Sequence, residues 1–178
     1  MIARSEELLP GTWALTVRSF QDTRGEFVKT YHAGLFRELG IPFTPAEEFF
    51  SVSRRNVIRG MHFQLPPHEH AKLVYCINGC VTDVVVDLRA ASRPGQVAAT
   101  ELSRANRKLL FIPPGIAHGF VAREDDTAMV YLTSAVHAPT HDAGIHWNSF
   151  DFEWGVPNPI VSERDQALPA LGTLQSLF

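Results

Sequence analysis

Short segments in which hydrophobic and polar residues alternate run along most of this chain, and turn-forming residues separate them. Alternation over about four to eight residues is typical of a β-strand with one buried face. We therefore predict strands over residues 13–20, 26–31, 97–102, 108–112, 119–122 and 128–133.

The longest strand pattern is KLVYCINGCVTDVVVDLR, which covers residues 72–89. Asn78-Gly79 in its middle is a pair typical of a two-residue hairpin turn. We therefore predict two directly paired strands, with Ile77 opposite Cys80. Cys76 and Cys80 are predicted to be free thiols, because disulfides are rare in a reducing compartment.

Helical periodicity is scarce. One segment, HAGLFRELG at residues 32–40, places Leu35, Phe36 and Leu39 on one face and ends with a glycine. Because glycine is the usual residue just past a helix C-terminus, we predict a short helix here.

Many short strands with few helices predict an all-β fold, a jelly-roll barrel or sandwich with one or two short helices. From about Asp151 the chain is richer in proline, which predicts an irregular C-terminal tail. No repeat or low-complexity linker divides the chain, so we expect residues 1–178 to form a single domain. A barrel binds ligands at its mouth or lumen, so inward-pointing polar residues are the candidates for a site.

The composition narrows the classes of partner. The 178 residues are 45% hydrophobic and 20% charged, and the net charge is −3 with the 16 Lys and Arg scattered. This pattern argues against nucleic acid, which selects a basic face. The segment MIARSEELLPG has two glutamates where a secretion signal needs an apolar run, and no stretch is long enough to cross a bilayer. We therefore expect a cytoplasmic protein with no nucleic-acid or membrane partner.

A metal site is one interpretation of the histidines. His68 and His70 form an H-x-H pair, and His118 in PPGIAH could supply a third ligand, as in metal-binding cupins. The glutamate that should follow such a pair is missing, and the cationic Lys72 stands there instead. Since the pair directly follows Pro66-Pro67, we expect it to lie in a loop at the barrel rim.

His62 lies in the strand-like segment RGMHFQ and shares a face with Gly60 and Gln64. It is either a core histidine bonded to a backbone carbonyl or an imidazole base oriented by a carboxylate. The sequence alone leaves both interpretations open.

Three further polar residues lie on apolar strands. Lys72 and Asp83 occupy the two arms of the predicted hairpin, so a buried ion pair between them is a reasonable hypothesis. A buried lysine can also stabilise a developing enolate oxygen. Tyr131 is either a core aromatic with a satisfied hydroxyl or a proton donor. Arg24 and Arg59, each next to a glycine, are either surface charges or a clamp for a diphosphate.

Six segments in order along the chain resemble one family: FQDTRGEF (20–27), RGMHFQ (59–64), KLV (72–74), DVVVDLR (83–89), FIPPGIAHGF (111–120) and SERD (162–165). This is the family of dTDP-4-dehydrorhamnose 3,5-epimerase and its relatives that act on nucleotide-linked 4-keto-6-deoxy sugars. The resemblance implies a cupin-like jelly-roll homodimer that works without a metal or other cofactor.

The resemblance also implies roles for residues. His62 is the expected base, Asp165 its dyad partner, Tyr131 the donor on the opposite face and Lys72 the enolate stabiliser. The residues expected to bind substrate are Arg24 and Arg59 at the diphosphate, His118 in the pocket wall, and Gln64, Phe27, Glu47, Phe49, Ser51, Asp83 and His137.

Base-holding positions differ from the family pattern. Glu47 and Phe49 replace a glutamine and an asparagine, and His137 replaces a tyrosine that stacks on the base. We therefore predict a nucleotide other than thymidine, such as cytidine or guanosine diphosphate.

The leading hypothesis is an epimerase that inverts C3, C5 or both in an NDP-linked 4-keto-6-deoxy sugar. The alternatives are a 3,4-ketoisomerase, a metal-dependent cupin oxygenase and a sugar-binding barrel without activity. A set with both a base and an acid argues against the last, because a binding module needs neither.

Overall fold

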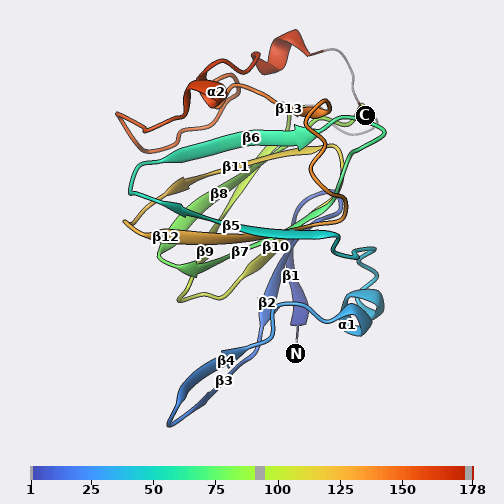
Figure 1. Cartoon of the computed structure of the whole chain (residues 1–178), viewed down its shortest axis with the longest axis vertical. Helices are drawn as coiled ribbons and strands as arrows, with labels where there is room; N and C mark the ends of the chain where they lie inside the picture. The colour runs from blue at the N-terminus through green and yellow to red at the C-terminus, as the bar shows by residue number, and fades with distance from the viewer. Residues whose placement is uncertain (1, 91–94, 175–177) are drawn as a thin grey trace.

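The structure, a computed structural model, describes residues 2–90, 95–174 and 178, and two antiparallel sheets dominate this part of the chain (Figure 1). The six-stranded sheet has the order β1 (Ile2–Leu9), β2 (Thr12–Val17), β10 (Leu109–Ile112), β7 (Lys72–Asn78), β12 (Thr127–Thr133), β5 (Glu47–Ser53). The five-stranded sheet has the order β13 (Asp142–Gly144), β6 (Ile58–Gln64), β11 (Ile116–Ala122), β8 (Cys80–Asp87), β9 (Val97–Ser103).

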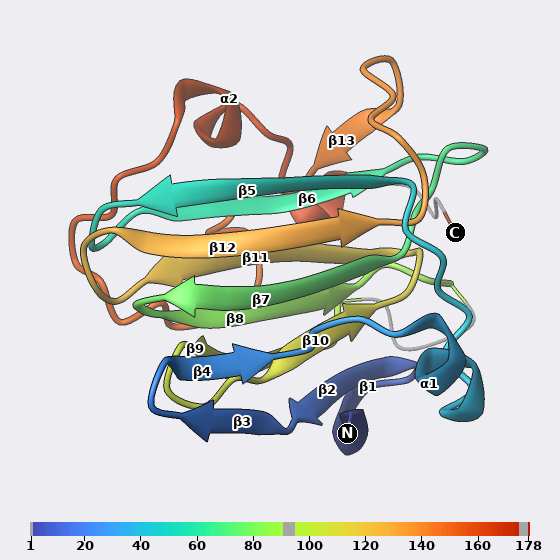
Figure 2. The ribbon, with the colours of Figure 1, turned by 60° about the horizontal axis from the view of Figure 1, so that its bottom comes forward.

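The two sheets stack face to face, as Figure 2 shows for β12 above β11 and β7 above β8. Between them lies a core of interdigitating side chains that includes Val74, Leu110 and Met129 from the six-stranded sheet and Val85 and Phe120 from the other. The alternation of the strands in sequence produces this core, since every second residue faces the opposite sheet. The all-β jelly-roll prediction is confirmed, with two open sheets.

The outer faces of both sheets are also covered. Helix α1 (Ala33–Glu38) packs Phe36 onto the six-stranded sheet. The C-terminal segment, irregular apart from α2 (Glu163–Gln166) and the 3₁₀ turn η1 (Leu171–Thr173), packs on the five-stranded sheet. Figure 1 shows this segment lying over β6.

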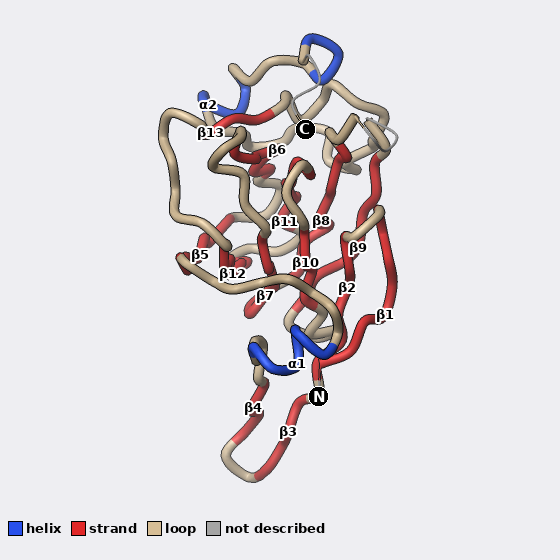
Figure 3. The backbone as a smooth tube through the Cα atoms, turned by 90° about the vertical axis from the view of Figure 1, so that its right-hand side faces the viewer, coloured by secondary structure: helices blue, strands red, loops and turns tan. Residues whose placement is uncertain are grey.

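A third, two-stranded sheet projects from the body as an arm (Figure 3). It consists of β3 (Ser19–Asp22) and β4 (Gly25–Val28), joined by a tight turn. Residues 13–20, predicted as one strand, are therefore divided, since β2 ends at Val17 and the arm begins at Ser19. Strands β1, β5 and β13 were not predicted. The helix at residues 32–40 is confirmed, and the side chain of His32 accepts a hydrogen bond from its Leu35 N–H.

The predicted hairpin around Asn78-Gly79 is wrong. Strand β7 pairs with β10 and β12, whereas β8 belongs to the other sheet and pairs Cys80 with Ser103. The chain therefore crosses between the sheets at Gly79, whose φ is +77°. A Cβ here would lie 2.4 Å from Oγ1 of Thr127, so the crossing needs glycine.

The two cysteines are free thiols, as predicted, with Cys76 buried and Cys80 partly exposed. Burial raises the pKa of the Cys76 thiol to about 11. Among the described residues, no helix has both the length and the hydropathy to span a membrane.

Candidate active site

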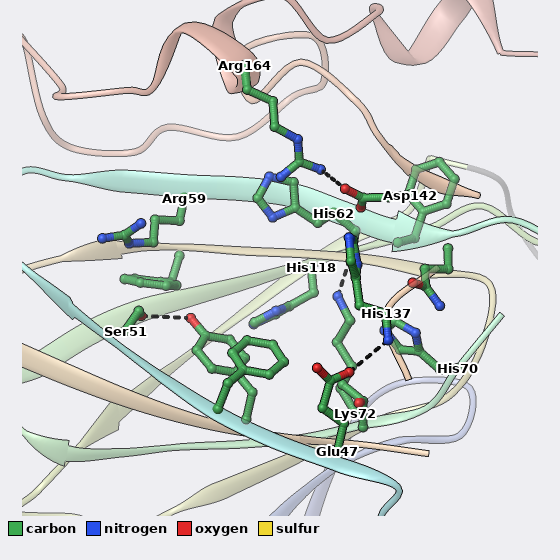
Figure 4. A pocket seen from close by; sticks show the side chains of 16 residues that line it. Glu47, Ser51, Arg59, His62, His70, Lys72, His118, His137, Asp142 and Arg164 are labelled. Atoms are coloured by element: carbon green, nitrogen blue, oxygen red, sulfur yellow. Dashed lines mark hydrogen bonds and ion pairs between the residues drawn. The ribbon is translucent and has the colours of Figure 1, made fainter. Parts of the chain in front are cut away.

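A cavity of about 360 Å³ opens between the two sheets (Figure 4). It is lined by Glu47, Phe49, Ser51, Arg59, His62, Phe63, Gln64, His70, Lys72, His118, Phe120, Tyr131, Thr133, His137, Asp142 and Arg164. The two walls come from different sheets: β5, β7 and β12 form one wall, and β6, β11 and β13 form the other. Ten of the fourteen predicted site residues line this cavity.

His62 and Asp165 form a hydrogen-bonded pair at the edge of the cavity, with 2.7 Å between Nε2 and Oδ1. The second carboxylate oxygen accepts the Gly60 N–H at 3.1 Å, and Ser162 caps α2 by accepting the Asp165 N–H. Burial would raise the pKa of Asp165, but the contacts with His62, the Gly60 N–H and the charge of Arg164 together outweigh it and hold the pKa below its usual value. Asp165 is therefore an ionised acceptor at neutral pH.

The imidazole of His62 is suited to accept a proton. Burial lowers its pKa, and this effect exceeds the opposing effect of Asp165. The ring is therefore neutral near pH 7. Because a carboxylate can only accept hydrogen bonds, Nε2 carries the proton toward Asp165 and Nδ1 keeps the free electron pair.

Arg59 reaches the same cavity because strand β6 is irregular. Strict alternation would put Arg59 and His62 on opposite faces, since they are three residues apart. Across the ladder to β11, however, His62 pairs with His118 and Arg59 pairs with Phe120. The extra residue on β6 is a bulge, and it turns both side chains to the cavity. Nε of Arg59 then donates to Oγ of Ser53 at 3.0 Å.

Lys72 lies on the opposite wall, with its side chain in the cavity and its Nζ 3.0 Å from the carbonyl oxygen of His62. Burial lowers the pKa of its ammonium to about 8. At neutral pH the group is still charged, so the cavity contains a buried cation beside the neutral imidazole.

Tyr131 also belongs to this wall. Its hydroxyl is 3.4 Å from Oγ of Ser51, and its ring stacks on Phe49 with 4.8 Å between centroids. Burial raises the pKa of the phenol. The hydroxyl therefore retains its proton until a strong base develops nearby.

The hypothesis of a Lys72–Asp83 ion pair is wrong, because Asp83 is hydrogen-bonded to His118. The Nε2 atom of His118 is 2.9 and 3.0 Å from the two Asp83 oxygens, and both residues are buried. Asp83 is fully enclosed behind His118 and does not line the cavity. Its effect on a ligand would act through His118.

Gln64 lines the cavity, but its amide is bonded to the backbone. Its Nε2 donates to the His68 carbonyl at 2.7 Å, and its Oε1 accepts the Ala138 N–H at 2.7 Å. Glu47 likewise accepts the backbone N–H of His137 at 2.8 Å. These two side chains therefore fix the loops that form the rim.

Arg24 and Phe27 lie outside the cavity of their own chain. Both belong to the arm, where Arg24 pairs with Asp22 and Phe27 is 60% exposed. These are the two predicted binding residues that the structure separates from the others.

Several cavity residues were not predicted: Phe63, His70, Phe120, Thr133, Asp142 and Arg164. His70 comes from the H-x-H pair that we expected at the rim. The pair does lie in a loop, but only His70 lines the cavity, while the ring of His68 packs near that of His141. In the described residues, no group of three His, Cys, Asp or Glu side chains is placed to hold a metal ion. This finding removes the proposed ligand set His68, His70 and His118.

The comparisons with known proteins identify the family. The family model described as dTDP-4-dehydrorhamnose 3,5-epimerase matches residues 6–173. This chain belongs to that family. A dTDP-4-dehydrorhamnose 3,5-epimerase of Mycolicibacterium smegmatis is 38% identical over 99% of this chain and 89% of the relative. A dTDP-4-dehydrorhamnose 3-epimerase of Streptomyces niveus is 38% identical over 89% of this chain and 78% of the relative.

Solved structures agree with this assignment. The dTDP-4-dehydrorhamnose 3,5-epimerase of Bacillus anthracis, solved with TDP and pyrophosphate bound, superposes with a TM-score of 0.93 at 32% identity. The match covers 96% of this chain and 99% of that structure. NovW, a 4-keto-6-deoxy sugar epimerase of Streptomyces spheroides, has a TM-score of 0.90 at 34% identity. This match covers 97% of this chain and 88% of the NovW chain. The predictions of the family, the cupin-like fold and an isomerase of the epimerase class are confirmed.

Proposed function

We propose that this enzyme inverts C3, C5 or both in a nucleotide-linked 4-keto-6-deoxy sugar, using His62 as base and Tyr131 as acid. The observation that carries the proposal is the arrangement of these groups on facing sheets, with the His62–Asp165 pair on one wall and Tyr131 on the other. Inversion requires a proton to leave one face of the carbon and another to arrive on the opposite face.

The proposed steps balance without a cofactor. Nδ1 of His62 takes the proton from the carbon beside the ketone, and the electron pair moves into the carbonyl to form an enolate. The ammonium of Lys72, which is buried, stabilises the enolate oxygen. Tyr131 then donates its hydroxyl proton to the other face of the carbon. Water reprotonates the phenolate and removes the proton from His62.

The direct test is solvent exchange. In deuterium oxide, the enzyme should place deuterium at C3, C5 or both of a 4-keto-6-deoxy sugar nucleotide, and NMR of the product should show an inverted carbon. A ketoisomerase would instead move the carbonyl from C4 to C3. The matched variant His62→Asn should retain the fold and lose exchange. Full exchange by His62→Asn would show that another group is the base.

We further propose that the enzyme is a homodimer and that the arm of one copy enters the cavity of the other. The apolar side chains that support this proposal are exposed at 50% or more: Phe20, Phe27, Phe50 and Val52. Exposed aromatic side chains on a projecting arm are typical of an interface. In this assembly the partner's arm would bring Arg24 toward the anionic end of the ligand, opposite Arg59.

Mixed dimers test this arrangement. If Arg24 acts across the interface, a dimer of one Arg24→Ala copy and one His62→Asn copy contains one intact site. Random mixing of the two variants should then restore about a quarter of the wild-type activity, whereas neither variant alone is active. If the arm served its own chain, mixing would restore nothing. Sedimentation of the wild type measures the dimer directly.

The nucleotide is also a proposal. The relatives above are named for dTDP-linked sugars, so dTDP is the first ligand to test. Our prediction from Glu47, Phe49 and His137 is a different nucleotide. Thermal-shift measurements with dTDP, CDP, GDP and UDP decide between them, since the tightest ligand raises the melting temperature most. We propose that the reaction takes place in the cytoplasm, which cell fractionation would test.

A further inference from the structure

An ion pair lies beside the hydrogen-bonded His62–Asp165 pair. Nη2 of Arg164 is 2.7 Å from Oδ2 of Asp142, and both residues line the cavity. Figure 4 shows this pair on one side of His62, away from Lys72. The reaction steps above do not use either residue.

The pair joins two elements, β13 and α2, that both contact β6, the strand that carries the base. Strand β13 pairs with β6, with Asp142 opposite Gln64 and Gly144 opposite His62. Helix α2 carries Arg164 next to Asp165. A contact between Arg164 and Asp142 therefore closes a ring from β6 through β13 and α2 back to the imidazole of His62.

Helix α2 has few other attachments to β6. The helix has four residues and is capped by Ser162. Upstream of it, an isolated bridge joins Ile160 to Val57 before β6 begins. Within the helix, Asp165 contacts His62 and Gly60. A helix this short has little stability of its own, so its orientation depends on such contacts.

We propose that Asp142 and Arg164 are positioning residues, which hold the carboxylate of Asp165 against His62 and set the charge balance around His62 and Lys72. This inference rests on the proposed function. It adds an outer ion pair to the hydrogen bond between Asp165 and His62 that orients the base.

The charges around His62 support this role. The groups that face it are Asp165 and Arg164 from α2, Lys72 from β7 and, as its ladder partner, His118 from β11. Burial and the two cations lower the pKa of His62, whereas Asp165 raises it. Arg164 therefore helps to keep the imidazole neutral and ready to accept a proton.

The effect of Asp142 on Lys72 is opposite to that of Arg164. Burial lowers the pKa of Lys72, and the charges that raise it are Asp142 from β13 and Asp83 from β8. Arg164 lowers it further. His70 lies in the loop before β7. Burial, together with the positive charge of Lys72, lowers the pKa of His70 to about 3. Asp142 thus restrains Arg164 and helps to keep Lys72 charged.

The two variants Arg164→Gln and Asp142→Asn should shift opposite limbs of the pH profile of deuterium exchange. Removing the Arg164 charge lets His62 protonate more easily, so the acid limb moves to higher pH. Removing the Asp142 charge lets Lys72 lose its proton more easily, so the alkaline limb moves to lower pH. We expect shifts of about half a pH unit, with kcat about fivefold lower and KM little changed.

Three controls make the result specific. Glu163→Gln changes a charge on the same helix outside the cavity and should leave both limbs in place. Arg164→Lys keeps the cation and should recover most of kcat. The double variant Asp142→Asn/Arg164→Gln should lose no more kcat than one single variant, because the residues act as a pair. Melting temperatures confirm that each variant is folded.

The outcomes separate this inference from the proposed function. If the wild type shows no exchange with any sugar nucleotide, the proposed function fails. If the wild type exchanges and both variants lose activity with unmoved limbs, the pair is merely structural and the inference is wrong. Additive losses of kcat in the double variant would also overturn it.

Discussion

Replacing Asp165 with asparagine isolates the contribution of the hydrogen bond between His62 and the carboxylate with almost no change in shape. In the native protein one carboxylate oxygen accepts from His62 and the other accepts from Gly60. An amide has only one oxygen, so it can serve only one of these two donors. If the oxygen faces Gly60, the amide NH₂ faces Nε2 of His62. The imidazole must then move its proton to Nδ1, the nitrogen needed as the base.

The size of the effect follows from the bond that is lost. A hydrogen bond to a charged group contributes about 1.5–3 kcal/mol. Because a tenfold change in rate corresponds to about 1.36 kcal/mol, kcat should fall by about 13-fold to about 160-fold. The carboxylate also raises the pKa of His62, so its removal lowers that pKa further and moves the acid limb to lower pH.

The assay is deuterium incorporation into the sugar, followed across pH by NMR. Ser162→Ala is the matched control, because it removes the cap of α2 and leaves the carboxylate in place. That variant should lose about 1 kcal/mol of stability and little activity per folded molecule. If Asp165→Asn exchanged within about threefold of the wild type with an unmoved acid limb, the assigned tautomer and role would be wrong.

Three further outcomes are expected. Lys72→Met should lower kcat by about 100-fold or more. In the wild type, activity should fall above pH 8, because the pKa of Lys72 is about 8 and the charged form is needed. A pH profile that stays flat above about pH 8 would contradict this. Tyr131→Phe should still exchange the proton at the base but form inverted product about 100-fold more slowly, as NMR of both signals would show; equal losses in both would argue against its role. Gly60→Ala should cost about 2–5 kcal/mol in urea unfolding, because φ is +130° and the new Cβ would lie 2.5 Å from Cα of Gly119. Gly172→Ala, with open space around it, is the control and should change stability by about 0.5 kcal/mol or less.

Local patterns predicted most of the strands and α1, because alternation and helix termination are written in adjacent residues. Adjacent residues do not determine which strands pair with each other. Asn78-Gly79 has the composition of a hairpin turn, yet the following residues are taken up by β9 and β11 in the other sheet. That choice depends on which faces can be buried together, which no short segment specifies.

The site shows the same division. The family resemblance predicted His62, Lys72, Tyr131 and Asp165 as one group, and the structure places them around one cavity. The bulge that turns Arg59 to the cavity is invisible in a pattern of alternation. Asp142 lies in a polar segment without periodicity, and Arg164, although it is part of the SERD segment, has no hydrophobic pattern around it that would predict a place in the cavity.

The crossing of the chain at Gly79 has a mechanical consequence. The base belongs to one sheet and the acid to the other, so the reacting carbon must lie between the two sheets within reach of both. The distance between base and acid is therefore set by the spacing between the sheets. That spacing is set by core side chains such as Val74 and Val85, which do not line the cavity. Substitutions that thicken or thin the core would therefore change the distance between the base and the acid. They should alter the rate of proton removal relative to the rate of proton return, although every residue of the site is unchanged.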